Sequence, residues 1–448
     1  MTRLSWCRLR RFRSVVAAGA LAVASVACTT TATRPSPSAT PSVSTSPSVS
    51  SSASPTTAPI AADRVLLHAP AGRSFLVHGA YPHHRSPCKH PEQPRLLARY
   101  PGSIEVRRAD DGTLSLTVTL PFESYLRGIA EVPPTWPMAA LEAQAIAARS
   151  YALATTGWSG QQGETLATPI CATTSCQVYG GMPVTPMPGT GWRWYAAVGR
   201  TAGLVLLYGG RPADTVYFST SNGQTYGNDV VFGSAPLPYL RPVAERDDGA
   251  SPTSRWQVRV GFHDLATFLH RAHLWPATAR IAAVSGDGDT VTVTDGAGTP
   301  HAIDGSDFRD AVNEWAPCLR PGLYPPSPLP ITIPSRWMDA SSSNGAAVVT
   351  GRGWGHGVGM VQWGAYGKAL HGWSASRILA YYYGGLTPQR YPEPGLIHVE
   401  VASGLRSVWL HASGSGATLN GRPLRPGAVV IVGGSTLTVG GSALPTSG

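Results

Sequence analysis

The sequence predicts an α+β fold that is rich in β-strand. The 448-residue chain contains 50 glycines and 40 prolines, residues that interrupt regular structure and favour many short strands joined by turns. Short apolar runs alternate with turn residues along most of the chain. One strongly helical run, from Met138 to Ala154, stands out. We therefore expect a β-rich domain with a few helices around a cleft, followed by a small C-terminal β segment.

The chain is only mildly basic outside its N-terminus. The formal net charge is +10, and it falls to +5 when the five arginines of residues 1–27 are set aside. Charged residues make up only 13% of the chain. This balance argues against a strong nucleic-acid binder, and we expect no nucleic-acid partner.

The N-terminus has the layout of a secretory signal over residues 1–27. A basic start is followed by the apolar run from Val15 to Ala27. Cys28 then stands where a lipoprotein would carry its lipid, although ordinary cleavage after Ala27 explains the same residues. Residues 28–62 are almost wholly Thr, Ser, Pro and Ala, a composition typical of an extended linker. We expect an exported protein.

Four cysteines follow the linker, at positions 88, 171, 176 and 318. In an oxidising compartment an even set predicts disulfides, and Cys171–Cys176 with Cys88–Cys318 is the simplest of three pairings. The Cys171–Cys176 spacing is longer than that of a CxxC zinc knuckle, which favours a local disulfide in a loop. A histidine-rich group near Cys88 fits a solvated loop better than a metal site: His83, His84 and His90.

Residues 63–395 are expected to form the main domain, which begins with strands. Ile104–Arg108 and Thr113–Leu120 have the pattern of a hairpin around residues 110–112. The second strand would place four apolar side chains on one face: Leu114, Leu116, Val118 and Leu120. Further strands are expected at Gly203–Tyr208 and Thr215–Phe218, and another hairpin is expected across residues 281–294.

A single carboxylate, Glu131, stands in a Pro- and Trp-rich turn directly before the helical run. Pro137 fits the first turn of that helix, where its missing N–H has no partner to lose, and Thr135 is a candidate N-cap. Burial beside Trp136 would raise the pKa of the carboxyl, whereas the helix N-terminus would lower it. The residue is therefore either a general acid in a dry cleft or an exposed loop residue.

A glycine-rich stretch, GRGWGHGVGMVQWGA, occupies residues 351–365. If it is extended, alternate residues from Gly351 to Gly359 lie on one face, with Trp354 and His356 on the other. A face without side chains lets a ligand or another backbone approach closely. The stretch predicts either tight strand packing around a satisfied His356 or one wall of a ligand cleft.

The C-terminal region begins with a short helix, capped by Ser374 and running through Tyr383. Residues 396–448 are expected to form a small β appendage or an extra sheet. The pattern there consists of alternating Ile397, Val399 and Val401, an Asn420-Gly421 hairpin turn, and an apolar run at Val429–Val432.

Taken together, motifs across roughly residues 100–390 resemble the stage II sporulation protein D/LytB (SpoIID/LytB) family of bacterial cell-wall proteins. They occur in this order: YLRG at 125–128, EVPPTWP at 131–137, LEAQAIAARSYAL at 141–153, CQVYG at 176–180, STSNG at 219–223, PYL at 238–240 and GWGHGVGMVQWGA at 353–365. Several long motifs in the family's order make a specific signal.

The resemblance implies a lytic transglycosylase that cleaves peptidoglycan glycan strands whose stem peptides have been removed, with Glu131 as the catalytic acid. One carboxylate suffices because the muramic acid 6-hydroxyl itself attacks and leaves an anhydro end. By the same resemblance, six residues would line or shape the cleft: Gln144, Arg149, Ser219, Ser221, His356 and Gln362. No cofactor is implied, and Cys171 and Cys176 alone do not make a four-ligand metal site.

Two rival functions stay open. A non-catalytic module that binds glycan and stimulates a cell-wall amidase would use the same cleft. A Cys/His peptidase would instead pair Cys176 with His356. Val361 departs from the family pattern, in which serine usually precedes the glutamine, and this bears on activity if that hydroxyl touches substrate. The expected partners are glycan strands and, in the first rival, an amidase. The expected location is the cell wall or the outer face of the cytoplasmic membrane, through a lipid on Cys28.

Overall fold

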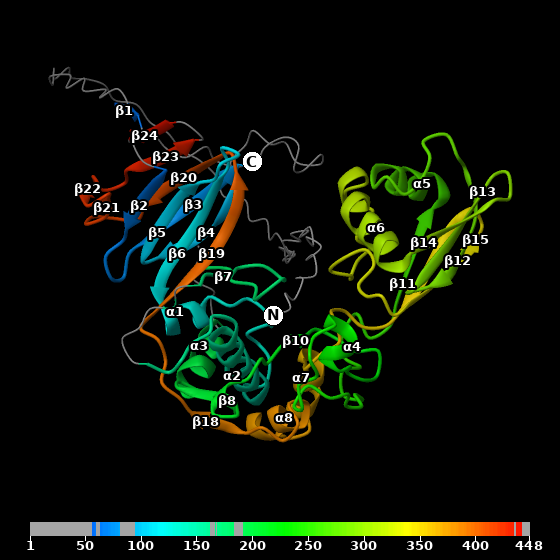
Figure 1. The fold of residues 1–448 in the computed structure, drawn as a ribbon, viewed down its shortest axis with the longest axis horizontal. Helices are drawn as coiled ribbons and strands as arrows, with labels where there is room; N and C mark the ends of the chain where they lie inside the picture. Colours follow the sequence, from blue (N-terminus) through cyan, green and yellow to red (C-terminus); the bar gives the residue numbers. More distant parts are fainter. Residues whose placement is uncertain are drawn as a thin grey trace, which may run out of the picture.

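The computed structural model describes residues 56–59, 63–80, 95–161, 166, 168–182, 191–433 and 436–440. Figure 1 shows three parts: a pair of β-sheets, a helical middle part, and a separate lobe on the right. The fold is α+β and β-rich, as predicted. The predicted signal peptide, most of the predicted linker, and Cys28, His83, His84, Cys88 and His90 lie outside the described residues. Within the described residues no helix is both long and apolar enough to cross a membrane.

The first part consists of two sheets that share one core. The seven-stranded sheet has the order β22 (Arg422–Pro423), β21 (Thr418–Leu419), β2 (Arg64–His68), β5 (Ser103–Arg108), β6 (Leu114–Pro121), β19 (Leu396–Leu405) and β7 (Ile170–Cys171). The six-stranded sheet has the order β1 (Thr56–Pro59), β24 (Thr436–Gly440), β23 (Val429–Gly433), β20 (Ser407–Ala412), β3 (Ser74–Ala80) and β4 (Arg95–Pro101). Leu116 of one sheet and Val77 of the other belong to the same buried cluster.

The predicted hairpin is confirmed as β5 and β6, which pair from Ser103↔Thr119 to Arg108↔Leu114. The four alternating apolar side chains of β6 are all buried, because one face of the strand packs on the core while the other faces out. Asp111 closes the turn by accepting the Thr113 N–H at 2.9 Å.

The C-terminal strands do not form a separate appendage. β19 pairs antiparallel with β6, from Leu396↔Pro121 to Leu405↔Leu114, and β20 pairs with β3. Part of the predicted linker also joins this region, because β1 pairs with β24. Alternation along the chain identifies these segments as strands, but it does not say which distant strand each one pairs with. The predicted Asn420-Gly421 turn is present, between β21 and β22.

The middle part is organised around α2 (Met138–Thr155), which is buried on most sides. Its neighbours are α1 (Phe122–Arg127), α3 (Gly191–Arg200), α7 (Gln362–Leu370), α8 (Ala375–Tyr382), β8 (Leu204–Tyr208) and β9 (Arg211–Pro212). β18 (Pro388–Arg390) pairs with β8. The alanines of α2 are small enough for these elements to pack closely against it.

The predicted cap of α2 differs from the observed one. Pro137, not Thr135, occupies the N-cap position, and no side chain caps the helix. The Pro137 carbonyl instead accepts the N–H groups of Ala140 and Leu141, at 3.0 and 3.1 Å. At the start of α8 the predicted cap is confirmed, since Ser374 accepts the Arg377 N–H at 3.3 Å.

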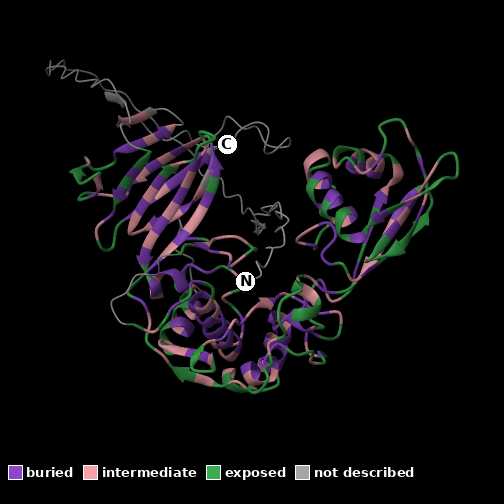
Figure 2. Cartoon of the chain, in the orientation of Figure 1, coloured by how far each residue is buried: buried purple, intermediate pink, exposed green. Residues whose placement is uncertain are grey.

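A lobe with its own core is inserted between residues 254 and 352, as Figures 1 and 2 show. Its sheet has the order β11 (Trp256–Gly261), β16 (Ala346–Gly351), β15 (Met338–Ser343), β12 (Ile281–Asp287), β13 (Thr290–Asp295) and β14 (Pro300–Asp304), all antiparallel. Two helices cover it, α5 (Phe262–Arg271) and α6 (Gly305–Leu319). The predicted hairpin at 281–294 is confirmed as β12 and β13, whereas the independence of this lobe was not predicted.

The glycine-rich stretch is not an extended strand. β16 ends at Gly351, and Gly353, Gly355, Gly357 and Gly359 all have positive φ angles between 78° and 114°. The backbone therefore winds past the segment that contains β10 (Tyr217–Phe218). A Cβ on Gly359 would lie 2.0 Å from the Val216 carbonyl oxygen. The glycines thus allow backbone to approach backbone, and β10 pairs in parallel with β17 (Met360–Val361).

A buried ion cluster attaches α7 to the loop at residues 245–247. Lys368 Nζ lies 2.9 Å from Glu245 Oε1 and 2.8 Å from Asp247 Oδ2. Lys368 is 2% exposed, and Tyr382 also donates to Glu245. Gly364 makes this approach sterically feasible, because a Cβ there would lie 2.4 Å from Glu245 Oε2.

Replacing the lysine should destabilise the protein strongly. In Lys368→Met the two carboxylates lose their counter-charge in a buried setting, so we expect a loss of about 3–5 kcal/mol in the free energy of unfolding. Urea denaturation followed by tryptophan fluorescence measures it. The control is Arg336→Gln, which removes an exposed pair with Asp289 and should cost less than about 1 kcal/mol. Equal effects for the two variants would show that the cluster does not stabilise the fold.

Candidate active site

The loop before α2 holds Glu131 against a second loop. Ala130 N–H donates to the Val178 carbonyl at 2.9 Å, and Gly180 N–H donates to the Gly128 carbonyl at 2.8 Å. Residues 128–131 and 178–180 therefore run side by side. Glu131 Oε1 accepts the Val178 N–H at 2.6 Å, a short bond of the kind that an ionised carboxylate makes with a backbone donor.

Polar side chains surround the rest of the carboxyl group. Tyr217 and Gln362 both hydrogen-bond to Glu131. Behind Tyr217, Gln177 Nε2 donates to the tyrosine oxygen at 2.9 Å, and Gln177 Oε1 accepts from the Tyr125 hydroxyl at 2.7 Å. Because the Tyr217 oxygen already accepts from Gln177, its own proton is available for donation to Glu131. The side chains thus form a directed chain of hydrogen bonds that ends on the carboxyl.

Burial raises the pKa of Glu131 from 4.5 to about 7. Its hydrogen bonds act in the opposite direction, because they stabilise the charged form, but desolvation outweighs them. The raised pKa agrees with the first of the two influences named from the sequence, which is burial of the carboxyl. Near neutral pH the group is present in both protonated and ionised forms, which is the condition for donating and then accepting a proton.

Gln144 and Gln362 meet beside this group. Gln362 is the first residue of α7, and its Nε2 lies 3.4 Å from Gln144 Oε1 on α2. Both side chains are buried, and Gln144 Nε2 has no hydrogen-bond partner among the described residues. A buried donor without a partner is costly, so a ligand oxygen at this position would be stabilised.

Three aromatic rings brace the same region. Trp136, at the end of the Glu131 loop, lies 5.0 Å from Trp363 and 5.2 Å from Tyr366 between ring centroids. The latter two rings belong to α7, so the cluster ties the loop to the helix that carries Gln362.

His356 is held as a neutral ring. Its Nδ1 accepts the Val358 N–H at 3.1 Å, so the proton resides on Nε2, which donates to the Tyr217 carbonyl at 2.9 Å. Burial lowers its pKa to about 4. The ring also packs near Phe218 and Phe232. His356 therefore ties the glycine-rich stretch to the backbone of Tyr217, next to the group that contacts Glu131.

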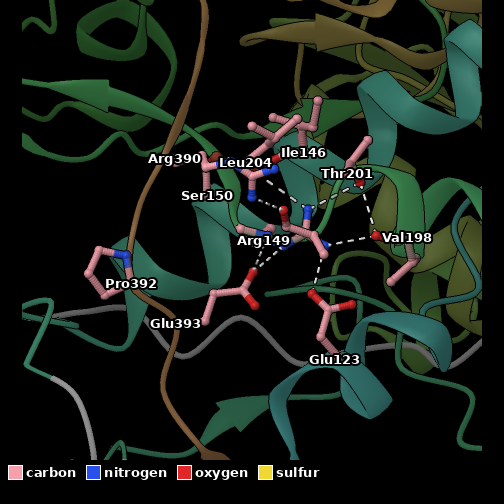
Figure 3. A network of polar contacts seen from close by, with 12 residues as sticks. Glu123, Ile146, Arg149, Ser150, Val198, Thr201, Leu204, Arg390, Pro392 and Glu393 are labelled. Carbon is pink, nitrogen blue, oxygen red and sulfur yellow. Dashed lines mark hydrogen bonds and ion pairs between the residues drawn. The ribbon is translucent and has the colours of Figure 1, made fainter.

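Arg149 lies within a network of polar contacts that joins neighbouring elements of the fold, as Figure 3 shows. Its side chain has no exposed surface, and its guanidinium pairs with Glu123 at 2.8 Å and Glu393 at 2.6 Å. It also donates to the carbonyls of Val198 and Leu204. These contacts join α2 to α1, α3 and the chain after β18, and they leave no face for a sugar.

The two serines expected at the cleft differ in their surroundings. Ser221 is buried, and both its N–H and its hydroxyl donate to Asp248 at 2.8 Å. Ser219 is partly exposed, and its carbonyl accepts the Trp363 N–H at 3.0 Å. Ser219 is thus the serine that a ligand could reach.

Cys171 and Cys176 form a disulfide. The bond closes the loop that precedes Gln177 and Val178, the two residues that position Glu131 and Tyr217. With its sulfur in a disulfide and His356 bonded to backbone, Cys176 cannot act as the thiolate of a Cys/His peptidase. Cys318 is disulfide-bonded too, and its predicted partner, Cys88, lies outside the described residues. Among the described residues no group of three or more His, Cys, Asp or Glu side chains is placed to hold a metal ion.

Sequence reasoning missed three residues around Glu131. Gln177 and Val178 lie in the CQVYG motif, which was noted only as part of a resemblance, and that motif was the available signal. Tyr217 belongs to a predicted strand, and nothing in that pattern marked its hydroxyl as a partner of a carboxyl more than 80 positions earlier.

Removing the Tyr217 hydroxyl should raise the Glu131 pKa further, because that bond favours the ionised form. In Tyr217→Phe we expect an upward shift of about one unit, which corresponds to about 1.4 kcal/mol of lost stabilisation of the carboxylate. Carbon-detected NMR titration of labelled glutamate, assigned with Glu131→Gln, measures it. Tyr195→Phe, on the exposed face of α3, is the control and should leave the pKa unchanged. A constant or lower pKa in Tyr217→Phe would show that the tyrosine does not donate to Glu131.

Comparison with known proteins identifies relatives. The model of a family described as stage II sporulation protein matches residues 110–208. An uncharacterized protein of Brachyspira hyodysenteriae is 30% identical over 289 residues, which cover 64% of this chain and 71% of that protein. The stage II sporulation protein D of Bacillus subtilis is 26% identical, over 64% of this chain and 79% of the relative. The amidase enhancer of Bacillus subtilis is 28% identical, over 59% of this chain but only 40% of the relative.

The matched residues include Glu131, α2 and the disulfide loop, whereas Tyr217, His356 and Gln362 of the site lie beyond the match. The chain belongs to the SpoIID/LytB family.

Proposed function

We propose that the protein remodels the bacterial cell wall as a lytic transglycosylase that cleaves peptidoglycan glycan strands already stripped of their stem peptides. The observation that carries the proposal is the buried Glu131 carboxyl with a pKa of about 7, bonded to Val178 N–H, Tyr217 and Gln362. The names of two relatives, a sporulation protein and an amidase enhancer, support a role in the cell wall.

The reaction needs one carboxyl. Protonated Glu131 donates its proton to the glycosidic oxygen, and the bond from that oxygen to C1 of muramic acid breaks. The 6-hydroxyl of the same sugar attacks C1, and its proton returns to the Glu131 carboxylate. The products are a new chain end with a free hydroxyl and a 1,6-anhydromuramyl end, and the enzyme is restored without water or a protein nucleophile.

The surroundings of Glu131 suit both halves of this cycle. Burial favours the neutral acid at the start, and the three hydrogen-bond donors stabilise the carboxylate when it forms. No other acid contributes to the shift of the Glu131 pKa, so no paired carboxylate of the kind used by ordinary glycosidases is evident beside it among the described residues. The unpartnered Nε2 of Gln144 supports a role for this residue as a donor to a sugar oxygen.

The alternative is a non-catalytic module that binds glycan and stimulates an amidase, and the likeness to a protein named amidase enhancer favours it. Both functions would use the same cleft. They differ in product: the enzyme leaves anhydromuramyl ends, whereas the enhancer raises amidase turnover and leaves none. In either case we propose that the protein is exported and acts at the cell wall or at the outer face of the cytoplasmic membrane, with Cys28 as the candidate lipidation site.

Glu131→Gln should abolish cleavage while leaving glycan binding intact, because glutamine keeps the shape but cannot donate and accept the proton. We expect a loss of about 10²–10⁴-fold in rate. Mass spectrometry of anhydromuramyl ends from amidase-treated peptidoglycan measures it. The matched control is Glu142→Gln on α2, which removes a carboxylate paired only loosely with Arg200 at 3.7 Å. Cleavage by Glu131→Gln at the wild-type rate would exclude Glu131 as the acid, and stimulated amidase without such ends would favour the enhancer.

The cleavage rate should depend on pH through the same group. The acid form starts the reaction, and the Glu131 pKa is raised to about 7, so activity is present below that pH and lost above it. We expect kcat/KM to fall about tenfold per pH unit above about 7. Initial rates on denuded glycan between about pH 5 and 9, with circular dichroism at each pH to check folding, provide the profile. Tyr217→Phe should move the midpoint upward, and a profile indifferent to that substitution would contradict the assignment.

A further inference from the structure

A groove lies where the lobe of residues 254–352 meets the rest of the protein. Its volume is about 670 Å³, within the range of small-ligand sites. Its walls come from the first strand and the last strand of the lobe, β11 and β16, together with Trp337 and the loop that contains Asn222. In Figure 1 this junction is where the right-hand lobe narrows to two connecting chains.

Two arginines line this groove at the ends of neighbouring strands. The β11–β16 ladder ends with Trp256 opposite Gly351, and Arg255 and Arg352 are the residues next to this last pair. Both line the groove, both are exposed, and neither forms an ion pair with a described carboxylate. Two positive charges that line one site without a carboxylate partner repel each other. Their juxtaposition at a concave site favours an anion between them.

The floor and side of the groove are aromatic. Trp256 lies over the backbone of Gly351, where a Cβ would come within 2.3 Å of the indole, and Trp256 Nε1 donates to the Gly353 carbonyl at 3.1 Å. Trp337 is partly exposed and stacks on Tyr226, with ring centroids 5.6 Å apart. Trp256 is 5% exposed and supports the groove from within, whereas the partly exposed Trp337 offers apolar contact to the face of a sugar.

Polar groups for hydroxyls are also present. Asn222 donates through Nδ2 to the Tyr226 hydroxyl at 2.7 Å, while its Oδ1 is buried and has no donor among the described residues. A ligand hydroxyl would supply the missing donor. Gln257 and Asp339 line the same groove and offer further acceptors.

We propose that this groove is a second glycan-binding position, which holds a muramic acid of a denuded strand by its lactyl carboxylate between Arg255 and Arg352. The proposal rests on the proposed function for its substrate. The groove offers positive charge, an aromatic ring and hydrogen-bonding groups, which together suit an acidic sugar. A phosphate polymer would pair with the arginines but would have no ring face to pack against tryptophan.

The groove is separate from the position of bond cleavage. Tyr217 and Phe218 are successive residues of β10, so their side chains point to opposite sides. Tyr217 contacts Glu131, whereas Phe218 lies 6.4 Å from Trp337 between ring centroids. The groove therefore anchors a strand at a distance from the scissile bond and contributes to affinity for long glycans rather than to the chemical step.

The test measures binding of glycan strands from amidase-treated peptidoglycan by calorimetry, with the full chain carrying Glu131→Gln. Adding Arg255→Gln or Arg352→Gln should weaken binding about tenfold each, the effect of removing a charge-assisted bond. The control is Arg280→Gln, an exposed arginine of the same lobe outside the groove. Circular dichroism melting checks that each variant stays folded.

A second measurement changes the ligand instead of the protein, and it tests whether the arginines bind the lactyl carboxylate. Glycan whose lactyl carboxylates have been amidated should bind the parent about tenfold more weakly, and the arginine variants should lose little more. The proposal would be overturned by any of three results. These are unchanged affinity in both arginine variants, an equal loss of affinity in Arg280→Gln, and full affinity for amidated glycan. Tighter arginine-dependent binding of a teichoic acid phosphate polymer would overturn it as well. Failure of Glu131 as the acid is distinguishable from failure of the groove, because it would appear as shortened glycan recovered after titration with Glu131→Gln, whereas failure of the groove would appear as unchanged affinity in the arginine variants.

Discussion

The contact between the Val178 N–H and the Glu131 carboxylate is the constraint on which the site depends. It is made because two loops, one before α2 and one after the Cys171–Cys176 disulfide, run side by side through backbone hydrogen bonds. The pairing packs the carboxyl against protein while the residue stays partly exposed, and the lost hydration raises its pKa to about 7. The environment of the carboxyl is thus set by the backbone as much as by any side chain.

The glycine-rich stretch and His356 serve the same purpose from the opposite side. Positive φ angles at alternating glycines let the chain wind closely around β10, and the histidine fixes the Tyr217 backbone with its single ring proton. His356 and Arg149, which look chemical in the sequence, are both bound to backbone or to scaffold carboxylates, so they position other groups.

The sequence predicted the local elements well because hydrophobic alternation and turn residues act locally. The β5–β6 hairpin, the Asn420-Gly421 turn and the Ser374 cap all follow from neighbours in the chain. The sequence contains no comparable local pattern that shows which distant strands pair with each other. The pattern in β19 is the same whether it forms an appendage or completes the sheet of β6, and the hydroxyl of Tyr217 is unremarkable until folding brings it to Glu131. The alternating glycines suggested a strand, but every second residue from Gly353 to Gly359 adopts a positive φ angle, which interrupts an extended backbone.

The position of β19 affects the stage of folding at which the site around Glu131 is formed. This strand lies between β6 and β7, and the Glu400 carbonyl holds Ala172, at the start of the disulfide loop. Ribosomes make the chain from its N-terminus, so Glu131 and its helix emerge long before residues 396–405 exist. Until that late strand pairs, the disulfide loop lacks the hydrogen bond from the Ala172 N–H to the Glu400 carbonyl. We therefore expect the contact between Val178 and Glu131 to form only after residues 396–405 have joined the sheet.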